Sequence, residues 1–200
     1  PIEGSGPGIL FWRAITQWMG GMGVIVLVVA VLPTVGSGGM SLLEAEAPGP
    51  TGERLTPRVR HTARRLWGVY LGFTVVLAAA YVGAGMNVYD GVTHSFTTVS
   101  TGGFSPYNRS LGHFDSGVIE WIAIVAMFVA GSSFTLIYRL IRGQAGPLVR
   151  SKEFHLYAVL VVVVSGIMFV INDAPGSIAD RVRGAFFATT TVTSTSGYAT

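Results

Sequence analysis

The chain has 200 residues, of which 50% are hydrophobic and only 12% are charged. Soluble domains carry about 25% charged residues, so this composition argues against a soluble fold and indicates an integral membrane protein. The net charge of +3 does not indicate nucleic acid as a partner, because the basic residues form short clusters between apolar runs, and the absence of cysteine excludes disulfides and thiolate chemistry.

Four stretches are long and apolar enough to cross a bilayer, which takes about 20 residues per helix. They are residues 14–33, 66–85, 119–138 and 154–171. A buried helix of a soluble protein is the alternative for any one of them. Four such stretches in one short chain, with almost no charge inside them, favour an all-α membrane protein.

The basic residues predict how these helices are oriented. Residues 44–65 and 139–153 contain at least four basic side chains each, whereas 86–118 contain only one. Basic residues accumulate on the cytoplasmic side of a membrane, so the first two regions are expected inside and 86–118 outside. Arg181 and Arg183 fall on the expected outer side and are an exception to the pattern.

Each expected outer region contains a segment without any charged residue, 91–108 and 184–200. These segments are too polar for spanning helices and too uncharged for ordinary loops. A helix of about 10 residues covers about 15 Å, half the hydrocarbon thickness, so each segment is predicted to enter the membrane, turn and leave on the same side. Non-helical backbone is tolerated at that depth only where protein buries it or where it lines a water-filled cavity.

The two uncharged segments contain near repeats of each other. "TTVSTGGFSP" (97–106) and "TVTSTSGYAT" (191–200) align without a gap, and an apolar helix precedes each. The matching residues are Thr97 with Thr191, Ser100 with Ser194, Thr101 with Thr195, Gly103 with Gly197, and Phe104 with Tyr198. A weaker echo joins Trp12, Ala14 and Ile15 to Trp121, Ala123 and Ile124. The chain is therefore expected to repeat a helix, a dipping loop and a helix.

The repeated loops have the composition of a cation filter. Rings of backbone carbonyls replace the hydration shell of an ion without placing a full charge in low dielectric. Such a loop needs small residues, hydroxyls and a glycine that permits positive φ, as in residues 100–104 ("STGGF") and 194–198 ("STSGY"). Phe104 and Tyr198 are expected to pack outward and hold the loops. A simple Ser/Thr/Gly turn is the alternative for one copy, and two copies disfavour it.

Other chemistry is less well supported. "GGMG" (20–23) lacks the spacing of a dinucleotide loop, and close packing of membrane helices explains it better, as it does Gly131, Ser132 and Ser133. The four histidines show no metal-ligand spacing, and His94 on the expected pore helix is interpreted as a packing or hydrogen-bonding residue. No acid–base or nucleophile arrangement appears, so the chain is not expected to be an enzyme, and no cofactor is expected.

Several motifs resemble a known family. "FWRAITQWMGGMGVIVL", "EAEAPGP", "LTPR", "HSFTTVSTGGFSPYN" and "FDSGVIEWIAIVAMFVAGSSF" are similar to the pore subunit of the bacterial Trk/Ktr/HKT potassium transporter superfamily, closest to the TrkH type. The resemblance covers essentially the whole chain. It implies helix–pore loop–helix units, four of them covalently linked around one pore, with re-entrant selectivity-filter loops.

The resemblance also implies how the chain divides into units. Residues 1–65 would hold the inner helix of a first unit plus a cytoplasmic loop. Residues 66–150 would be a complete second unit, with helices at 66–85 and 118–140 and the pore helix and filter at 88–105. Residues 151–200 would hold the outer helix and pore loop of a third unit. The first and fourth filters would then lie outside this sequence, which is expected to be part of a longer chain.

The filter residues implied by the resemblance are Ser100, Thr101, Gly102, Gly103, Ser194, Thr195, Ser196 and Gly197, which would bind potassium through their backbone carbonyls. Potassium would be the transported substrate, and no transition-metal site is implied. The expected partners are a cytoplasmic nucleotide-binding subunit of the TrkA type and a second copy of the subunit, in the bacterial inner membrane. A sodium-permeable relative and a non-conducting structural membrane fragment remain alternatives.

Overall fold

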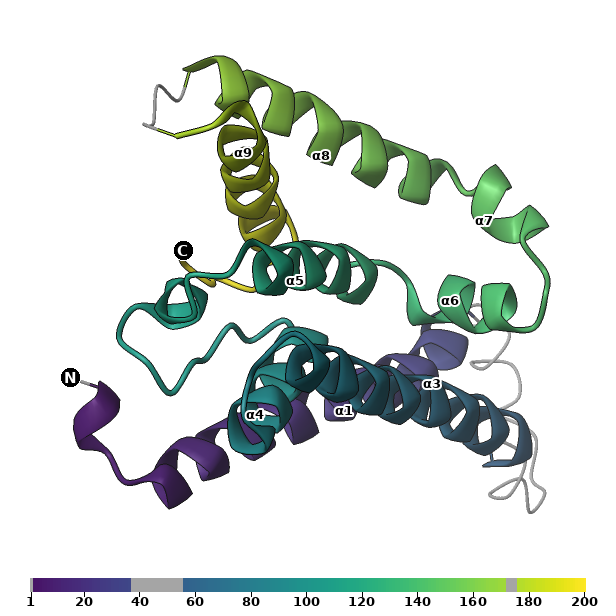
Figure 1. The fold of residues 1–200 in the computed structure, drawn as a ribbon. Helices are drawn as coiled ribbons and strands as arrows, with labels where there is room; N and C mark the ends of the chain where they lie inside the picture. The colour runs from purple at the N-terminus through teal and green to yellow at the C-terminus, as the bar shows by residue number, and fades with distance from the viewer. Residues whose placement is uncertain (1, 37–55, 172–175) are drawn as a thin grey trace, which may run out of the picture.

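The computed structural model describes residues 2–36, 56–171 and 176–200, and within these ranges the side chains of residues 24–36 and 56–62 are not described. The regular elements in the described ranges are all helical (Figure 1). The α-helices are α1 (Pro7–Gly36), α3 (Thr56–Gly83), α4 (Val88–Val99), α5 (Gly117–Ala130), α6 (Phe134–Ile141), α7 (Gly146–Arg150), α8 (Lys152–Ile171) and α9 (Ile178–Thr193). Two 3₁₀ turns, Ile2–Gly4 and Ser110–His113, complete the order.

Two of the expected spans are helices long and apolar enough to cross a membrane, Ala63–Gly83 within α3 and Lys152–Ile171, which is α8. Along α8 the buried residues are Val161 and Ser165, so most of its apolar surface is free to face lipid. The expected span 14–33 lies within α1. Its side chains after residue 23 lie outside the described residues, as does most of the basic loop before α3.

The expectation of one continuous helix over 118–140 is wrong. The chain forms α5 and α6, which bend by 104° at a short break. The break falls on Gly131, Ser132 and Ser133, which are poor residues for a helix interior. The Ser132 hydroxyl donates to the Phe128 carbonyl at 2.9 Å, and the amide of Ser132 bonds three residues back instead of four. These local bonds compete with the regular helical ladder, and α6 leaves in a new direction.

The helices pack in the same way in two places. The short helix α4 contacts α3, which precedes it, and α1. The short helix α9 contacts α8, which precedes it, and α5. Figure 1 shows α9 descending from the end of α8 toward α5, with α4 beside α1 and α3 on the other side of α5. The repeat in the sequence is therefore also a repeat in the packing.

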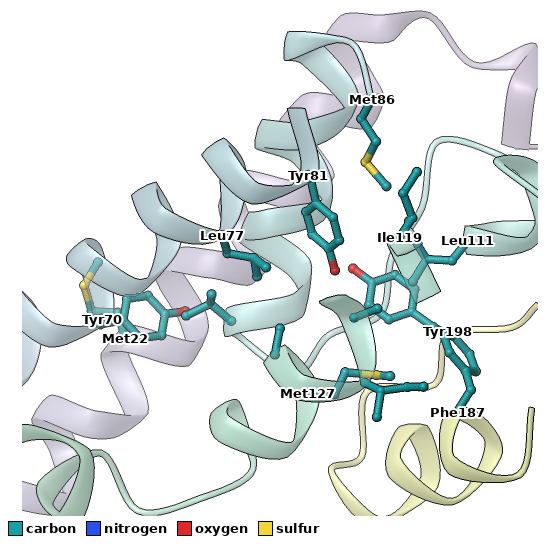
Figure 2. Close-up of a cluster of buried hydrophobic side chains, with 14 residues drawn as sticks. Met22, Tyr70, Leu77, Tyr81, Met86, Leu111, Ile119, Met127, Phe187 and Tyr198 are labelled. Atoms are coloured by element: carbon teal, nitrogen blue, oxygen red, sulfur yellow. The ribbon is translucent and has the colours of Figure 1, made fainter. Parts of the chain in front are cut away.

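A buried apolar cluster lies between the two copies. Figure 2 shows Tyr81 from α3, Met127 from α5, Phe187 from α9 and Tyr198 from the chain after α9 converging in it. All four side chains are almost completely buried. Since each comes from a different segment, this cluster joins α3, α5, α9 and the chain after α9 into one core.

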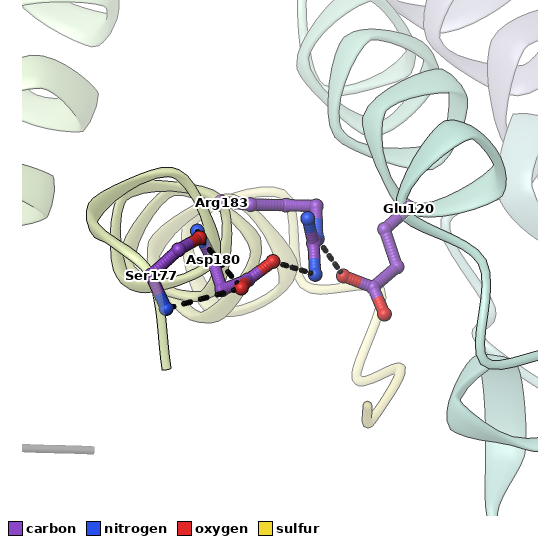
Figure 3. A network of polar contacts seen from close by, with 4 residues as sticks. All are labelled: Glu120, Ser177, Asp180 and Arg183. Carbon is purple, nitrogen blue, oxygen red and sulfur yellow. Dashed lines mark hydrogen bonds and ion pairs between the residues drawn. The ribbon is translucent and has the colours of Figure 1, made fainter. Parts of the chain in front are cut away.

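A polar network fixes the start of α9 against α5 (Figure 3). Ser177 and Asp180 form a capping box, and Arg183 bridges Asp180 at 2.8 Å and Glu120 of α5 at 2.6 Å. The pKa of Asp180 lies below its ordinary value because Ser177 donates hydrogen bonds to the carboxylate and Arg183 lies beside it. Arg183 was one of the two basic exceptions on the expected outer side, and carboxylates on two helices hold it there.

Candidate functional site

The eight predicted filter residues lie in two loops, each at the carboxyl end of a short helix. Ser100–Gly103 follow α4, and Ser194–Gly197 follow α9. The two loops touch, because a Cβ atom built on Gly103 would overlap the carbonyl oxygen of Ser196. The structure therefore brings the two predicted sets of residues into one site, although 94 positions separate their equivalent members along the chain.

The backbone of both loops alternates in the same way. Thr101 has a φ of 52° and Gly103 of 61°, and the equivalent Thr195 and Gly197 have φ values of 60° and 81°. The residue between each pair lies outside this left-handed region. A β-branched residue rarely adopts positive φ, and such strain costs about 1–3 kcal/mol. The same strained conformation occurs at the equivalent threonine in both copies. The rest of the fold must therefore stabilise this backbone conformation in each loop.

The amide bonds of the loops show where the carbonyls point. The amides of Gly102 and Gly103 donate to the carbonyl of Thr97 at 2.7 Å and 3.2 Å, and the amide of Gly197 donates to the carbonyl of Thr191 at 3.1 Å. In a trans peptide the N–H and C=O bonds point in opposite directions. The carbonyls of the preceding residues, Thr101, Gly102 and Ser196, are thus directed away from the short helix that anchors their loop.

A threonine hydroxyl closes each loop. Thr97 Oγ1 donates to the carbonyl of Phe104 at 2.8 Å, and Thr191 Oγ1 donates to the carbonyl of Tyr198 at 3.1 Å. Each threonine therefore holds the second half of its loop through its carbonyl, and the aromatic residue that follows the loop through its hydroxyl. The alignment of the two threonines was visible in the sequence, but this role as a clamp was not.

The two aromatic residues that end the loops behave differently from each other. Tyr198 is buried, and its hydroxyl lies 2.6 Å and 3.0 Å from the hydroxyls of Thr97 and Thr98 on α4. Phe104 is 38% exposed and lies against the guanidinium of Arg13. The expectation that both pack outward is wrong for Tyr198, because its hydroxyl finds partners inside the neighbouring copy.

A tyrosine and a glycine support the first serine of each loop. A Cβ on Gly21 would lie 2.9 Å from the Tyr70 hydroxyl and 3.0 Å from Ser100 Cβ. A Cβ on Gly131 would lie 2.7 Å from the Tyr157 hydroxyl and 3.2 Å from Ser194 Cβ. The close packing expected of "GGMG" and of Gly131 is thus found at these two glycines. Sequence reasoning missed the tyrosines, because they lie at different distances from their loops along the chain.

A cavity with a partly polar wall adjoins the first loop, and a second one lies at the carboxyl end of α9, just before the second loop. One of about 490 Å³ lies beside Ser100 and Thr101, with Gln17 and Tyr70 in its wall. Another of about 250 Å³ lies beside Thr193 and includes Glu153. Irregular backbone within a membrane requires such surroundings, because water or protein must satisfy its polar groups.

His94 is a buried hydrogen-bonding residue, as expected. Its Nδ1 lies 2.8 Å from the Asp90 carbonyl oxygen, and its Nε2 lies 3.0 Å from Ser105 Oγ, just past the first loop. It therefore ties the exit of the loop to α4. Within the described ranges, no three His, Cys, Asp or Glu side chains gather closely enough to hold a metal ion.

Comparisons with known proteins identify similar sequences and a similar fold. The family model described as "TrkH: Cation transport protein" matches residues 3–155. The Trk system potassium uptake proteins TrkH of Vibrio parahaemolyticus and Escherichia coli are 39% and 37% identical over 199 and 197 residues, and each match covers 96% of this chain and 41% of the relative. The crystal structure of the potassium transporter TrkH from Vibrio parahaemolyticus superposes with a TM-score of 0.83 at 32% identity, covering 99% of this chain and 40% of that one. The chain thus spans about two fifths of the length of these relatives.

Proposed function

Because the chain belongs to the TrkH family of cation transport proteins, we propose that it forms part of a potassium pathway across the membrane. In this proposal the backbone carbonyls of Ser100–Gly103 and Ser194–Gly197 replace the hydration shell of the ion. The relatives are named as potassium uptake proteins, and the same transport is proposed for the gene product that contains this chain.

The observation that carries the proposal is the matched backbone of the two loops. Positive φ recurs at Thr101 and Thr195 and at Gly103 and Gly197. The amides of Gly102, Gly103 and Gly197 donate to carbonyls near the ends of the short helices. This leaves carbonyls directed away from α4 and α9, and the partially negative carboxyl ends of these helices favour a cation at the loops. A simple turn needs neither the repeated strain nor the repeated threonine clamp.

The unit division follows from the same proposal. Residues 1–65, 66–150 and 151–200 would contribute the inner helix of one pore unit, a complete second unit, and the outer helix and pore loop of a third. A closed pore would then need further filters beyond these two. A cytoplasmic nucleotide-binding partner of the TrkA type, a homodimer and a bacterial inner-membrane location belong to the proposal as well, on the strength of the family.

The test is growth of potassium-uptake-deficient cells at low potassium. The full-length gene product is expected to restore growth, and Gly103→Asp is expected to abolish the rescue while the protein still reaches the membrane. Gly20→Ala is the control, because no described atom lies within 4 Å of a Cβ at that position. Alanine is used there because aspartate would add a charge within a helix. Full rescue by Gly103→Asp would overturn the filter assignment. Sodium uptake without potassium uptake would favour the sodium-permeable alternative.

A further inference from the structure

One face of α1 follows the first filter loop along its length. Arg13, Gln17 and Gly21 recur every four residues, so they lie on the same side of the helix. Gly21 contacts Ser100 at the start of the loop, Gln17 contacts Gly102 in its middle, and Arg13 bonds to Ser105 just past its end. The loop therefore rests against three successive turns of a helix that belongs to a different proposed unit.

Arg13 makes the most specific of these contacts. Its Nη2 donates to the Ser105 carbonyl at 2.9 Å, and its guanidinium carbon lies 4.6 Å from the centre of the Phe104 ring. A hydrogen bond from a charged donor is stronger than one from a neutral donor, and the face of an aromatic ring attracts a cation. Among the described residues the ion pairs join Arg183 to Glu120 and Asp180, and none includes Arg13. The contacts of Arg13 are thus with the end of the filter segment itself.

Gln17 fills the space that the missing side chain of Gly102 leaves open. A Cβ on Gly102 would overlap the Gln17 side chain and lie 2.7 Å from its Cδ and Nε2 atoms. Ser105 is also bonded from the opposite side by His94. The segment from Gly102 to Ser105 is consequently held between α4 and the Arg13–Gln17 face of α1.

The second loop lacks this polar support. Gly131 of α5 contacts Ser194 as Gly21 contacts Ser100, but the residues one and two turns earlier on α5 are Met127 and Ala123. Both are completely buried in the apolar core. The two loops share their backbone conformation, yet only the first is held by an arginine and a glutamine.

We propose that Arg13 and Gln17 are positioning residues that set the outer half of the first filter and thereby its discrimination between potassium and sodium. This inference rests on the proposed function of the loops. Backbone carbonyls discriminate between ions through the position and number of the oxygens they present. A loop that is released at Phe104 and Ser105 would present them less precisely, and the loss would appear in ion selectivity before it appears in the rate of transport.

The test compares variants of the full-length gene product in membrane vesicles, with potassium uptake and its inhibition by sodium as readouts. Arg13→Ala is expected to reduce potassium-over-sodium discrimination about tenfold, as for loss of one charged hydrogen bond, at similar maximal uptake. Arg13→Lys is expected to restore part of it, because lysine reaches the carbonyl but stacks less well on the ring. Arg65→Ala, an arginine beside the ring of Tyr138 and away from the loops, is the matched control.

Phe104→Leu guards against a variant that fails to fold, because it removes the ring and leaves the Arg13 hydrogen bond. The double variant Arg13→Ala with Phe104→Leu is expected to lose less discrimination than the sum of the losses in the two single variants, because the two side chains act together. Unchanged discrimination in Arg13→Ala and Phe104→Leu, or strictly additive effects, would overturn the inference. A parent protein that transports no potassium would instead contradict the proposed function, so the two failures are distinct.

Discussion

The phenolic oxygen of Tyr198 lies 2.6 Å from the hydroxyl of Thr97, although 101 positions separate the two residues. The same phenol lies 3.0 Å from Thr98 Oγ1 and donates to the His94 carbonyl at 3.2 Å. Tyr198 ends the second loop, and Thr97 anchors the first. This contact therefore connects the two candidate filters directly through side chains, and it sets the spacing between them.

Removal of the Tyr198 hydroxyl is expected to loosen this connection. Tyr198→Phe keeps the buried ring, and Thr97 and Thr98 keep their other partners, so the expected loss of unfolding free energy is about 1 kcal/mol. Thermal unfolding of the detergent-solubilised protein measures it. Tyr89→Phe is the control, because that hydroxyl bonds to the Pro7 carbonyl in an exposed position. An equal effect of the two substitutions would contradict a special role for the Tyr198–Thr97 contact.

The two filter glycines are expected to differ in their tolerance of alanine. Both have positive φ, so each substitution strains the backbone by about 1 kcal/mol or more. Gly103→Ala also drives a methyl group into the Ser196 carbonyl, whereas no described atom lies within 4 Å of a Cβ on Gly197. Potassium uptake by the full-length gene product should therefore fall further in Gly103→Ala than in Gly197→Ala. The reverse order would show that the contact between the loops is not as described.

Adjacent glycines in α1 provide a closely matched pair for the packing behind the first filter. Gly21→Val places its side chain against Tyr70 and Ser100, whereas no described atom lies within 4 Å of a Cβ on Gly20. Overpacking of a tight contact costs about 1–3 kcal/mol. We expect Gly21→Val to lower thermal stability and transport together and Gly20→Val to leave both nearly unchanged. Similar behaviour of the two variants would argue against close approach of α1 to the loop.

The Arg183–Glu120 pair is expected to contribute modestly to holding α9 against α5. Both side chains are partly exposed, so loss of the pair in Glu120→Gln should cost about 1 kcal/mol. The difference from the unmodified protein should shrink when salt is raised from about 0.1 M to about 1 M, because the screening length falls from about 10 Å to about 3 Å. Thermal unfolding at the two salt concentrations measures it. The exposed Glu153, as Glu153→Gln, is the control, and a salt-independent loss would indicate packing instead of charge.

The sequence by itself predicted the membrane class and the two spans within α3 and α8. It also predicted which residues form the two loops after α4 and α9. These predictions succeeded because they depend on local physics. Burial of backbone in hydrocarbon requires long apolar helices. An uncharged, glycine-containing segment between such helices is typical of a loop that is buried in protein or lines a water-filled cavity. The repeat of Thr97 and Gly103 in Thr191 and Gly197 was readable for the same reason, since equivalent backbone conformations select equivalent residues.

The break after Ala130 was partly visible in the sequence. Gly131, Ser132 and Ser133 are weak helix formers, but small residues also permit close helix packing, and composition cannot separate the two effects. The structure shows both at once, with Gly131 against Tyr157 and Ser194 and α6 turned by 104°.

Tertiary structure alone decided which residues meet across the copies. The Tyr198 ring was expected to pack outward from its loop, yet its hydroxyl lies against that of Thr97. Arg13 bonds to Ser105 from a helix some 90 positions earlier in the chain. Sequence spacing carries no information on such contacts, because they depend on how whole helices pack and not on a local period. The sequence determined the positions of two glycine-containing loops, each of which follows a short helix. Only the packing of α1, α4 and α9 decided what holds those loops, since buried hydroxyl, amide and guanidinium groups must take partners wherever the fold supplies them.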